Sequence, residues 1–204
     1  IPVRPAITLK THLGALKMTT LLQEILAHNR TFLEKNAFPK EISKYPGKKF
    51  ALLTCMDTRL AELINNALGI HRGDAKIIQN AGTSLIEDMG ETVKSLLLTI
   101  YIFDIKEILI VGHYDCGVAQ TSSAAILQKM HNRGIADQQI ALIEDDFKAW
   151  LDTYTDPAQN VLAVVKKLRA NPFIPGDISI HGLIIDPHSG KLDLLADGYK
   201  DTKG

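Results

Sequence analysis

The sequence predicts an α/β fold: a mostly parallel central sheet flanked by helices, with a C-terminal antiparallel edge hairpin. Short continuous apolar runs alternate along the chain with longer segments whose apolar residues recur at helical spacing. Strands that alternate with helices pair in parallel and are buried on both faces, so their apolar runs are continuous. The final pair of apolar runs is separated only by a turn, which favours a hairpin.

The first half of the chain contains three expected helices and two expected strands. Apolar residues follow helical spacing from Thr19 to Leu33, and Pro39 and Pro46-Gly47 then break the chain. The next expected elements are a buried strand at 50–55, a short helix at 59–68 ending at Gly69, a strand at 75–79 and an apolar helix at 92–103.

The second half repeats the alternation and ends in the hairpin. A third buried strand is expected at 107–111, followed by helices at about 118–132, 138–151 and 157–169. Asp156-Pro157 marks the start of the last helix, as a cap followed by proline at the first helical position. Strand residues at 178–185, a turn at 186–190 and a strand at 191–196 complete the sheet.

Composition restricts the partners and the compartment. The 204 residues carry 23 basic and 23 acidic side chains, a formal net charge of zero, so there is no electrostatic footprint for nucleic acid or for a membrane surface. No apolar stretch approaches the roughly 20 residues needed to span a bilayer. Two cysteines do not make a disulfide scaffold. We therefore expect no nucleic-acid or membrane partner, a reducing compartment and a cytoplasmic location.

The first 17 residues differ from the rest of the chain. They contain two prolines, one glycine, three basic residues and no acidic residue, and they precede Met18. We expect residues 1–17 to be a leader or extension outside the fold and residues 18–204 to form a single domain. If the leader is a targeting remnant, an organellar location follows instead.

Two short motifs carry the chemistry, and both follow predicted strands. They are Cys55-Met56-Asp57-Thr58-Arg59 and His113-Tyr114-Asp115-Cys116. In open α/β sheets, ligands bind at the carboxyl ends of the strands, where the strand order reverses. Two thiolates and an imidazole suit zinc, and three protein ligands with one open position are typical of catalytic zinc.

Other interpretations of these residues stay open at this point. A buried cysteine is commonly a small apolar residue. A thiolate near Arg59 would have a lowered pKa and could act as a nucleophile, although this leaves the second cysteine idle. Asp57 could simply cap a helix, Arg59 could be a surface charge, and Tyr114, Asp115 and Ser84 favour solvated loop positions.

Together the motifs resemble the signature of the β-class carbonic anhydrases, with the pattern Cys55-x-Asp57-x-Arg59 and His113-x-x-Cys116-Gly117. The resemblance extends from about residue 21 to residue 199 and includes the Asn80-Ala81-Gly82 run; the compact length is similar to that of the small bacterial-type members. It implies a Zn²⁺ enzyme, a carbonate dehydratase, that interconverts carbon dioxide and bicarbonate through a metal-bound hydroxide. It also implies a homodimer or a larger homo-oligomer.

The resemblance assigns a role to each motif residue. Cys55, His113 and Cys116 would bind zinc, and Asp57 and Arg59 would form the catalytic pair. Two thiolates and a neutral imidazole cancel the charge of zinc, so its bound water should ionise less readily than at a three-histidine site, where the pKa is about 7. Arg59 compensates by adding positive charge and by keeping Asp57 ionised.

The ionised Asp57 carboxylate can only accept a hydrogen bond, so it would orient the hydroxide toward carbon dioxide. In some members of the family the equivalent aspartate becomes a fourth zinc ligand at lower pH. Activity should therefore rise with pH through the neutral to alkaline range.

Three residues are expected to shape the substrate pocket: Gly82, Thr83 and Gly117. Many family members have glycine or another small residue where Thr83 stands. Four histidines are candidate proton shuttles: His71, His131, His181 and His188. Two other functions remain, hydrolysis of carbonyl sulfide or carbon disulfide on the same zinc site and a non-catalytic zinc-binding module. Zinc storage alone would need neither Asp57 nor Arg59.

Overall fold

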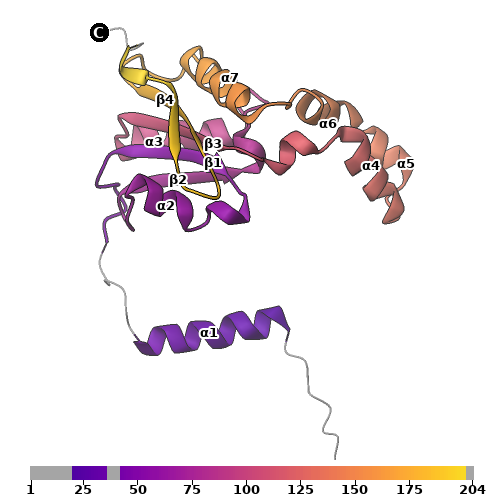
Figure 1. Cartoon of the computed structure of the whole chain (residues 1–204), viewed down its shortest axis with the longest axis horizontal. Helices are drawn as coiled ribbons and strands as arrows, with labels where there is room; N and C mark the ends of the chain where they lie inside the picture. The colour runs from indigo at the N-terminus through magenta and orange to yellow at the C-terminus, as the bar shows by residue number, and fades with distance from the viewer. Residues whose placement is uncertain (1–19, 36–41, 201–204) are drawn as a thin grey trace, which may run out of the picture. The chain divides into compact units, whose positions relative to one another are not determined.

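The computed structural model describes residues 20–35 and 42–200 (Figure 1). The chain divides into two units, residues 1–42 and 43–204. In the first unit the described element is α1 (Leu21–Lys35), and Thr20 Oγ1 accepts a hydrogen bond from the amide of Gln23 at 3.3 Å near its start. No residue of α1 is buried. The expected leader at 1–17 lies outside the described residues.

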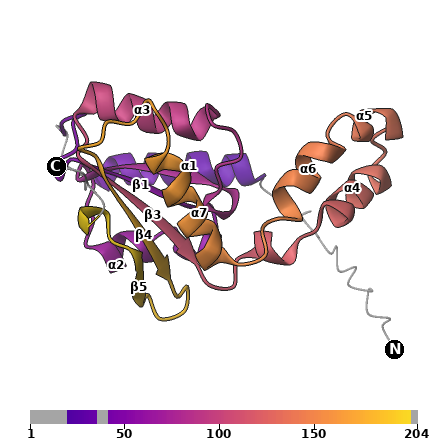
Figure 2. The same ribbon diagram turned by 90° about the horizontal axis from the view of Figure 1, so that it is seen from above.

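The second unit is built on a five-stranded sheet with the order β2-β1-β3-β4-β5 (Figures 1 and 2). β1 pairs in parallel with β2 and β3, and β3 pairs in parallel with β4. β5 runs antiparallel to β4. The expected α/β class and edge hairpin are confirmed, with strands β1 (Phe50–Cys55), β2 (Ala75–Asn80), β3 (Glu107–His113), β4 (Ser179–Ile185) and β5 (Leu192–Ala196).

Helices alternate with the strands along the second unit. They are α2 (Leu63–Leu68), α3 (Glu91–Phe103), α4 (Ser123–Asn132), α5 (Asp137–Ala141), α6 (Glu144–Leu151) and α7 (Pro157–Arg169). Short 3-10 turns are η1 (Thr58–Leu60), η2 (Ala81–Thr83), η3 (Gly117–Gln120) and η4 (Gly198–Lys200). In the described part of the chain no helix has the length and apolar content needed to cross a bilayer.

Alternate residues of β1 face opposite halves of the core. Ala51 and Leu53 pack in one cluster with apolar residues of α3 and α7, whereas Leu52 packs in a second cluster with Ile64 of α2. Accordingly, α7 and α2 lie on opposite sides of the sheet (Figure 1). Burial on both sides explains the continuous apolar runs of the central strands.

Two helices expected as single elements are divided. The segment 59–68 begins as η1 and becomes helical again only at α2. The segment 138–151 forms α5 and α6, and α6 begins with three acidic residues, Glu144, Asp145 and Asp146. Negative charge is favourable at a helix N-terminus, which explains a new start there. Figure 2 shows α4, α5 and α6 grouped together at one end of the unit.

α7 packs unusually close to β3 and β4. A Cβ on Gly112 would lie 2.6 Å from Val161 Cγ2, and a Cβ on Gly182 would lie 3.0 Å from Val161 Cγ1. Only glycine allows the helix to approach the two strands this closely. The first turn of α7 is thereby fixed beside the carboxyl end of β3.

The strand order places a switch point between β1 and β3. The chain passes from β1 to β2 on one side of β1, whereas β3 lies on the other side. Such a reversal leaves a crevice at the carboxyl ends of the two strands. Those ends are Cys55 and His113.

Candidate metal centre

Cys55, His113 and Cys116 meet at the switch point. The two sulfur atoms and an imidazole nitrogen all lie within 4.8 Å of one another, and all three residues are buried. Cys55 ends β1, His113 ends β3, and Cys116 follows three residues later, directly before η3. The three expected ligands are thus brought together.

The hydrogen bonds of His113 leave one nitrogen available to a metal. Its Nδ1 lies 2.8 Å from the carbonyl oxygen of Tyr114. A carbonyl only accepts, so Nδ1 carries the proton and Nε2 has a free lone pair. Nε2 is buried and has no hydrogen-bond partner among the described residues. A buried, unpartnered imidazole nitrogen beside two thiols fits a zinc ligand whose ring is oriented through its other nitrogen.

The two thiols perturb each other. Cys55 has a raised pKa, first because its side chain hydrogen-bonds Cys116 and second because it is buried. Cys116 has a lowered pKa, first because it accepts the hydrogen bond of Cys55. One thiol therefore stabilises the other as a thiolate. A divalent cation that displaces the remaining proton satisfies both sulfur atoms, because metal binding releases protons from its ligands.

Asp57 and Arg59 form a paired carboxylate and guanidinium next to the cluster. Arg59 Nε donates to Asp57 Oδ1 at 3.0 Å, and Arg59 Nη2 donates to Oδ2 at 2.9 Å. The hydrogen bonds from Arg59 lower the pKa of Asp57 to about 2, so its carboxylate is ionised near neutral pH. Oδ2 lies 3.7 Å from His113 Nε2. The carboxylate therefore borders the candidate metal site.

Asp57 also caps η1, because its Oδ1 accepts a hydrogen bond from the Arg59 amide at 2.9 Å. The capping interpretation and the ion pair are thus both correct. Capping fixes the backbone of Asp57 at the end of β1, and the guanidinium fixes its side chain.

Asp115 is a second partner of Arg59. Arg59 Nη1 donates to Asp115 Oδ2 at 2.7 Å, and Nη2 donates to the Asp115 carbonyl oxygen at 2.8 Å. Asp115 has a left-handed backbone, with φ of 54°. Arg59 and then Gln120 lower the pKa of Asp115, and Gln120 Nε2 lies 2.6 Å from its Oδ1. The expectation of a solvated loop role missed this contact, whose only sequence signal was the position directly before Cys116.

The three expected pocket residues have different surroundings. The Gly82 amide donates to Cys55 Sγ at 3.4 Å, and Gly82 has a φ of 71°. Thr83 is fully buried, and its Oγ1 donates to the Val111 carbonyl at 3.4 Å. Gly117 begins η3 next to Cys116, and a Cβ there would meet no atom within 4 Å. The close passage of the backbone past the metal site is therefore seen at Gly82.

Two further residues reach the Gly82–Thr83 loop: Tyr154 from the connection between α6 and α7, and Asn160 from the first turn of α7. Tyr154 is buried, and its hydroxyl donates to the Gly82 carbonyl at 2.9 Å. Asn160 Nδ2 lies 3.1 Å from the same carbonyl and 3.2 Å from that of Thr83. Burial, followed by the charge of Cys116, raises the pKa of Tyr154, so its hydroxyl remains a donor. Neither residue carries a motif that sequence reasoning could have used.

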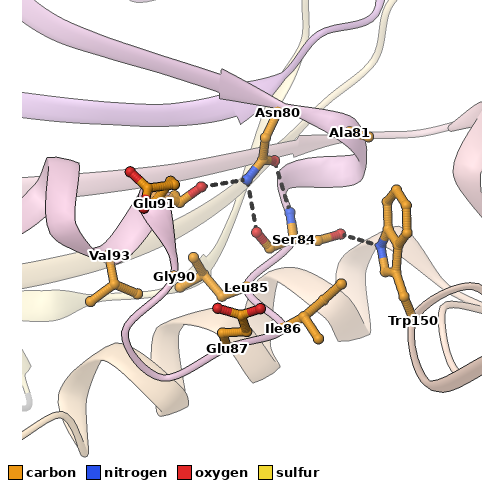
Figure 3. Close-up of a pocket in the computed structure, with 11 residues that line it drawn as sticks. Asn80, Ala81, Ser84, Leu85, Ile86, Glu87, Gly90, Glu91, Val93 and Trp150 are labelled. Atoms are coloured by element: carbon orange, nitrogen blue, oxygen red, sulfur yellow. Dashed lines mark hydrogen bonds between the residues drawn. The ribbon is translucent and has the colours of Figure 1, made fainter. Parts of the chain in front are cut away.

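A cavity of about 320 Å³ adjoins the same loop (Figure 3). Asn80 hydrogen-bonds both main-chain groups of Ser84, at 2.8 and 3.0 Å, and Trp150 Nε1 donates to Ser84 Oγ at 3.2 Å. These contacts tie the end of β2 to α6 along the wall of the cavity.

The candidate proton shuttles are dispersed. His181 is buried on β4 beside Leu109, and its Nδ1 accepts a hydrogen bond from the Gly198 amide at 3.1 Å. His188 lies in the hairpin turn, as expected, and contributes to the lowered pKa of Asp115 after Arg59 and Gln120. Of these two histidines, only His188 affects the pKa of Asp115, the residue that contacts Arg59.

The buried thiol–imidazole–thiol cluster at the switch point of a mostly parallel sheet could hold a metal ion, and an ionised carboxylate held by arginine borders it. The family model described as "Carbonic anhydrase" matches residues 50–192. The chain belongs to the β-carbonic anhydrase family. The expected family, fold and enzyme class are confirmed.

Individual relatives show how far the similarity extends. The chain is 38% identical over 186 residues to "Putative carbonic anhydrase YtiB" of Bacillus subtilis, covering 89% of this chain and 100% of that protein. The crystal structure of β-carbonic anhydrase isoform I from Trichomonas vaginalis superposes with a TM-score of 0.86 at 36% identity, over 89% of this chain and 100% of the other. A carbon disulfide hydrolase of an Acidianus strain is 31% identical over 71% of this chain and 76% of its own length.

Proposed function

We propose that the protein catalyses the reversible hydration of carbon dioxide to bicarbonate and a proton, with zinc held by Cys55, His113 and Cys116. The observation that carries the proposal is the buried Nε2 of His113, which is unpartnered among the described residues and belongs to a cluster with two buried thiols. When bound, zinc would supply the Lewis acidity that makes a hydroxide nucleophile available near neutral pH.

Asp57 orients the nucleophile. Its carboxylate is ionised and can only accept hydrogen bonds, so it accepts the hydrogen of the attacking oxygen and leaves the lone pair directed at the carbon of carbon dioxide. Arg59 holds the carboxylate at two points. Asp115 also accepts hydrogen bonds from Arg59, through both its carboxylate and its carbonyl oxygen.

Arg59 also supplies charge to the site. Two thiolates and one neutral imidazole bring two negative charges, which cancel those of a zinc dication. The guanidinium restores positive charge in the neighbourhood, and its pKa is raised, first through its hydrogen bonds to Asp57 and then through those to Asp115. It is therefore a permanent cation.

Hydrolysis of carbon disulfide or carbonyl sulfide is the second candidate function. The Acidianus relative is named for carbon disulfide hydrolysis. The higher identity to the Bacillus carbonic anhydrase sequence supports carbon dioxide as the substrate. Stopped-flow measurement of proton release with carbon dioxide, and of sulfide release with the two sulfur compounds, decides between them. Sulfide release without carbon dioxide hydration would overturn the proposal.

A non-catalytic zinc-binding module is less well supported. Metal storage needs the three ligands but does not need a carboxylate held at two points beside them. The Asp57–Arg59 pair, with Asp115 behind it, gives the site a fixed acceptor, as turnover requires.

We further propose a homodimer or larger homo-oligomer in the cytoplasm. Two features support assembly: β2 is an edge strand of the sheet, and α1 exposes a set of large apolar side chains, namely Leu21, Leu22, Ile25, Leu26, Phe32 and Leu33. The two free cysteines suit a reducing compartment. Size-exclusion chromatography with light scattering tests the assembly, and a monomer at micromolar concentration would contradict it.

A further inference from the structure

The loop that follows β2 has a strained backbone conformation. Gly82 and Thr83 are consecutive residues with positive φ, at 71° and 56°. Glycine adopts this conformation freely, but threonine is β-branched and rarely does so. Backbone strain of this kind persists only where the surrounding structure holds it in place, and it gathers at functional sites.

Tyr154 and Asn160 hold the strained loop. The Tyr154 hydroxyl and the Asn160 amide both donate to the Gly82 carbonyl, at 2.9 and 3.1 Å. Asn160 also donates to the Thr83 carbonyl at 3.2 Å. The carbonyls of Gly82 and Thr83 therefore both accept hydrogen bonds, from Tyr154 in the α6–α7 connection and from Asn160 in the first turn of α7.

Asn160 lies in the first turn of α7, whose start is held by a cap and by packing on the sheet. Asp156 caps α7 by accepting hydrogen bonds from the amides of Ala158 and Gln159, at 2.7 and 3.2 Å. Val161, the neighbour of Asn160, packs directly on the backbone of Gly112 at the end of β3. The position of Asn160 is thus set by the same strand that presents His113.

The loop, in turn, acts on a metal ligand. With its carbonyl held, Gly82 directs its amide at Cys55 Sγ, at 3.4 Å. A hydrogen bond from an N–H to a thiolate sulfur withdraws negative charge from the sulfur and fixes the direction of its lone pairs. Hydrogen bonds to the first ligands of a metal tune both its affinity and its electronic properties.

We propose that Tyr154 and Asn160 are positioning residues that act through Gly82 on the Cys55 thiolate and so set the strength of zinc binding. The inference rests on the proposed zinc site. It adds two residues, 99 and 105 positions after Cys55 in the chain, to the machinery that the motifs define. Without them the Gly82 amide would no longer be held toward the sulfur.

The test uses two variants and a matched control in the full-length protein. Tyr154→Phe removes one hydroxyl, and Asn160→Asp replaces the donor amide by an acceptor of the same size. Tyr101→Phe is the control, because its hydroxyl also donates to a main-chain carbonyl, that of Phe173, at 2.9 Å. Zinc release to an excess of chromophoric chelator and the thiolate-to-metal charge-transfer band of the cobalt(II)-substituted protein are measured, with circular dichroism as the check on folding.

We expect Tyr154→Phe and Asn160→Asp to release zinc about 10-fold to 100-fold faster than the wild type, and to shift the cobalt band, because partners of metal ligands typically contribute on this scale. Tyr101→Phe should match the wild type in both the rate of zinc release and the position of the cobalt band. Folded variants with the wild-type release rate and an unshifted band would overturn the inference, even if their melting temperatures fell. A wild-type protein that takes up neither metal would instead overturn the zinc site itself, and the inference with it.

Discussion

Arg59 donates a hydrogen bond to each carboxylate oxygen of Asp57, from Nε to Oδ1 at 3.0 Å and from Nη2 to Oδ2 at 2.9 Å. The same guanidinium reaches Asp115 with Nη1, at 2.7 Å. The arginine therefore links the loop after β1 to the loop after β3; Cys55 and His113 end these strands, and Cys116 lies in the second loop. A carboxylate held in this way lies beside the candidate metal site, where it can orient a nucleophile.

Asp57→Asn should keep zinc and lose turnover. An amide of the same shape presents an N–H where an acceptor is needed, and it no longer pairs with the Arg59 charge. We expect kcat for carbon dioxide hydration to fall by at least about 100-fold, the lower end for a positioned proton acceptor. Stopped-flow hydration and zinc content are measured on the same preparation.

The control for this substitution is Asp74→Asn. Asp74 also accepts a hydrogen bond from a backbone amide, that of His71 at 2.9 Å, and pairs with Lys48 outside the cluster. The Asp74→Asn substitution should leave turnover unchanged. An Asp57→Asn enzyme with wild-type kcat would remove Asp57 from the mechanism.

Activity should rise with pH between about 6 and 9, because the attacking water must lose a proton before it reacts. Asp57 cannot be the titrating group in that range, since its pKa is lowered to about 2 by Arg59. The same shift also affects folding stability: the ion pair stabilises the folded protein above pH about 3.9, the pKa of Asp57 in the unfolded chain. This stabilisation is lost as the pH falls toward the lower pKa of Asp57 in the folded protein. A pH profile of kcat/KM that is flat over this interval would contradict the hydroxide mechanism.

Gly82→Ala should destabilise the protein more than Gly69→Ala. Both glycines have positive φ, but a Cβ on Gly82 would lie 2.9 Å from Tyr154 Cε2, whereas a Cβ on Gly69 meets nothing within 4 Å. We expect a loss in the free energy of unfolding of about 1–2 kcal/mol at Gly69 from the backbone alone. Overpacking adds about 1–3 kcal/mol at Gly82. Urea unfolding measures the free energy of unfolding of both variants. Equal losses would show that the structure around Tyr154 can accommodate the added Cβ of Gly82→Ala.

Gly112→Ala should be rescued in part by Val161→Ala. The added Cβ would lie 2.6 Å from Val161 Cγ2, so the single variant should lose about 1–3 kcal/mol of stability through overpacking. Removing the valine methyl groups makes room for it. A double-mutant cycle in urea checks the coupling. Additive losses would mean that α7 does not rest on β3 at this point.

Sequence patterns were sufficient for the parts of the fold that depend on local chemistry. Continuous apolar runs located the strands, and the two motifs fell at strand ends, so parallel pairing alone was enough to bring Cys55 and His113 together. The Asp57–Arg59 pair, in contrast, was predicted from the resemblance to the β-class carbonic anhydrases, and the two hydrogen bonds between the side chains agree with it. These relationships span few residues or follow from the order of the strands.

The supporting residues were not predictable because they depend on distant packing. Asn160 reaches Gly82 from α7, which packs on Gly112 and Gly182, and Tyr154 reaches it from the connection before α7; no short pattern encodes these contacts. Asp115 was expected in a solvated loop position, because no short pattern predicts the left-handed backbone at which it contacts Arg59. The break between α5 and α6 was missed because the apolar spacing continues across it.

The zinc content of purified protein, wild type beside Cys116→Ser, tests the central claim most directly. The cluster of two thiols and an imidazole predicts about one zinc per chain in the wild type and the loss of most of it when one thiolate is replaced by a hydroxyl. Inductively coupled plasma mass spectrometry against protein concentration gives both numbers. A wild-type protein with less than about half a zinc per chain, or a Cys116→Ser variant that retains a full equivalent, would contradict the site.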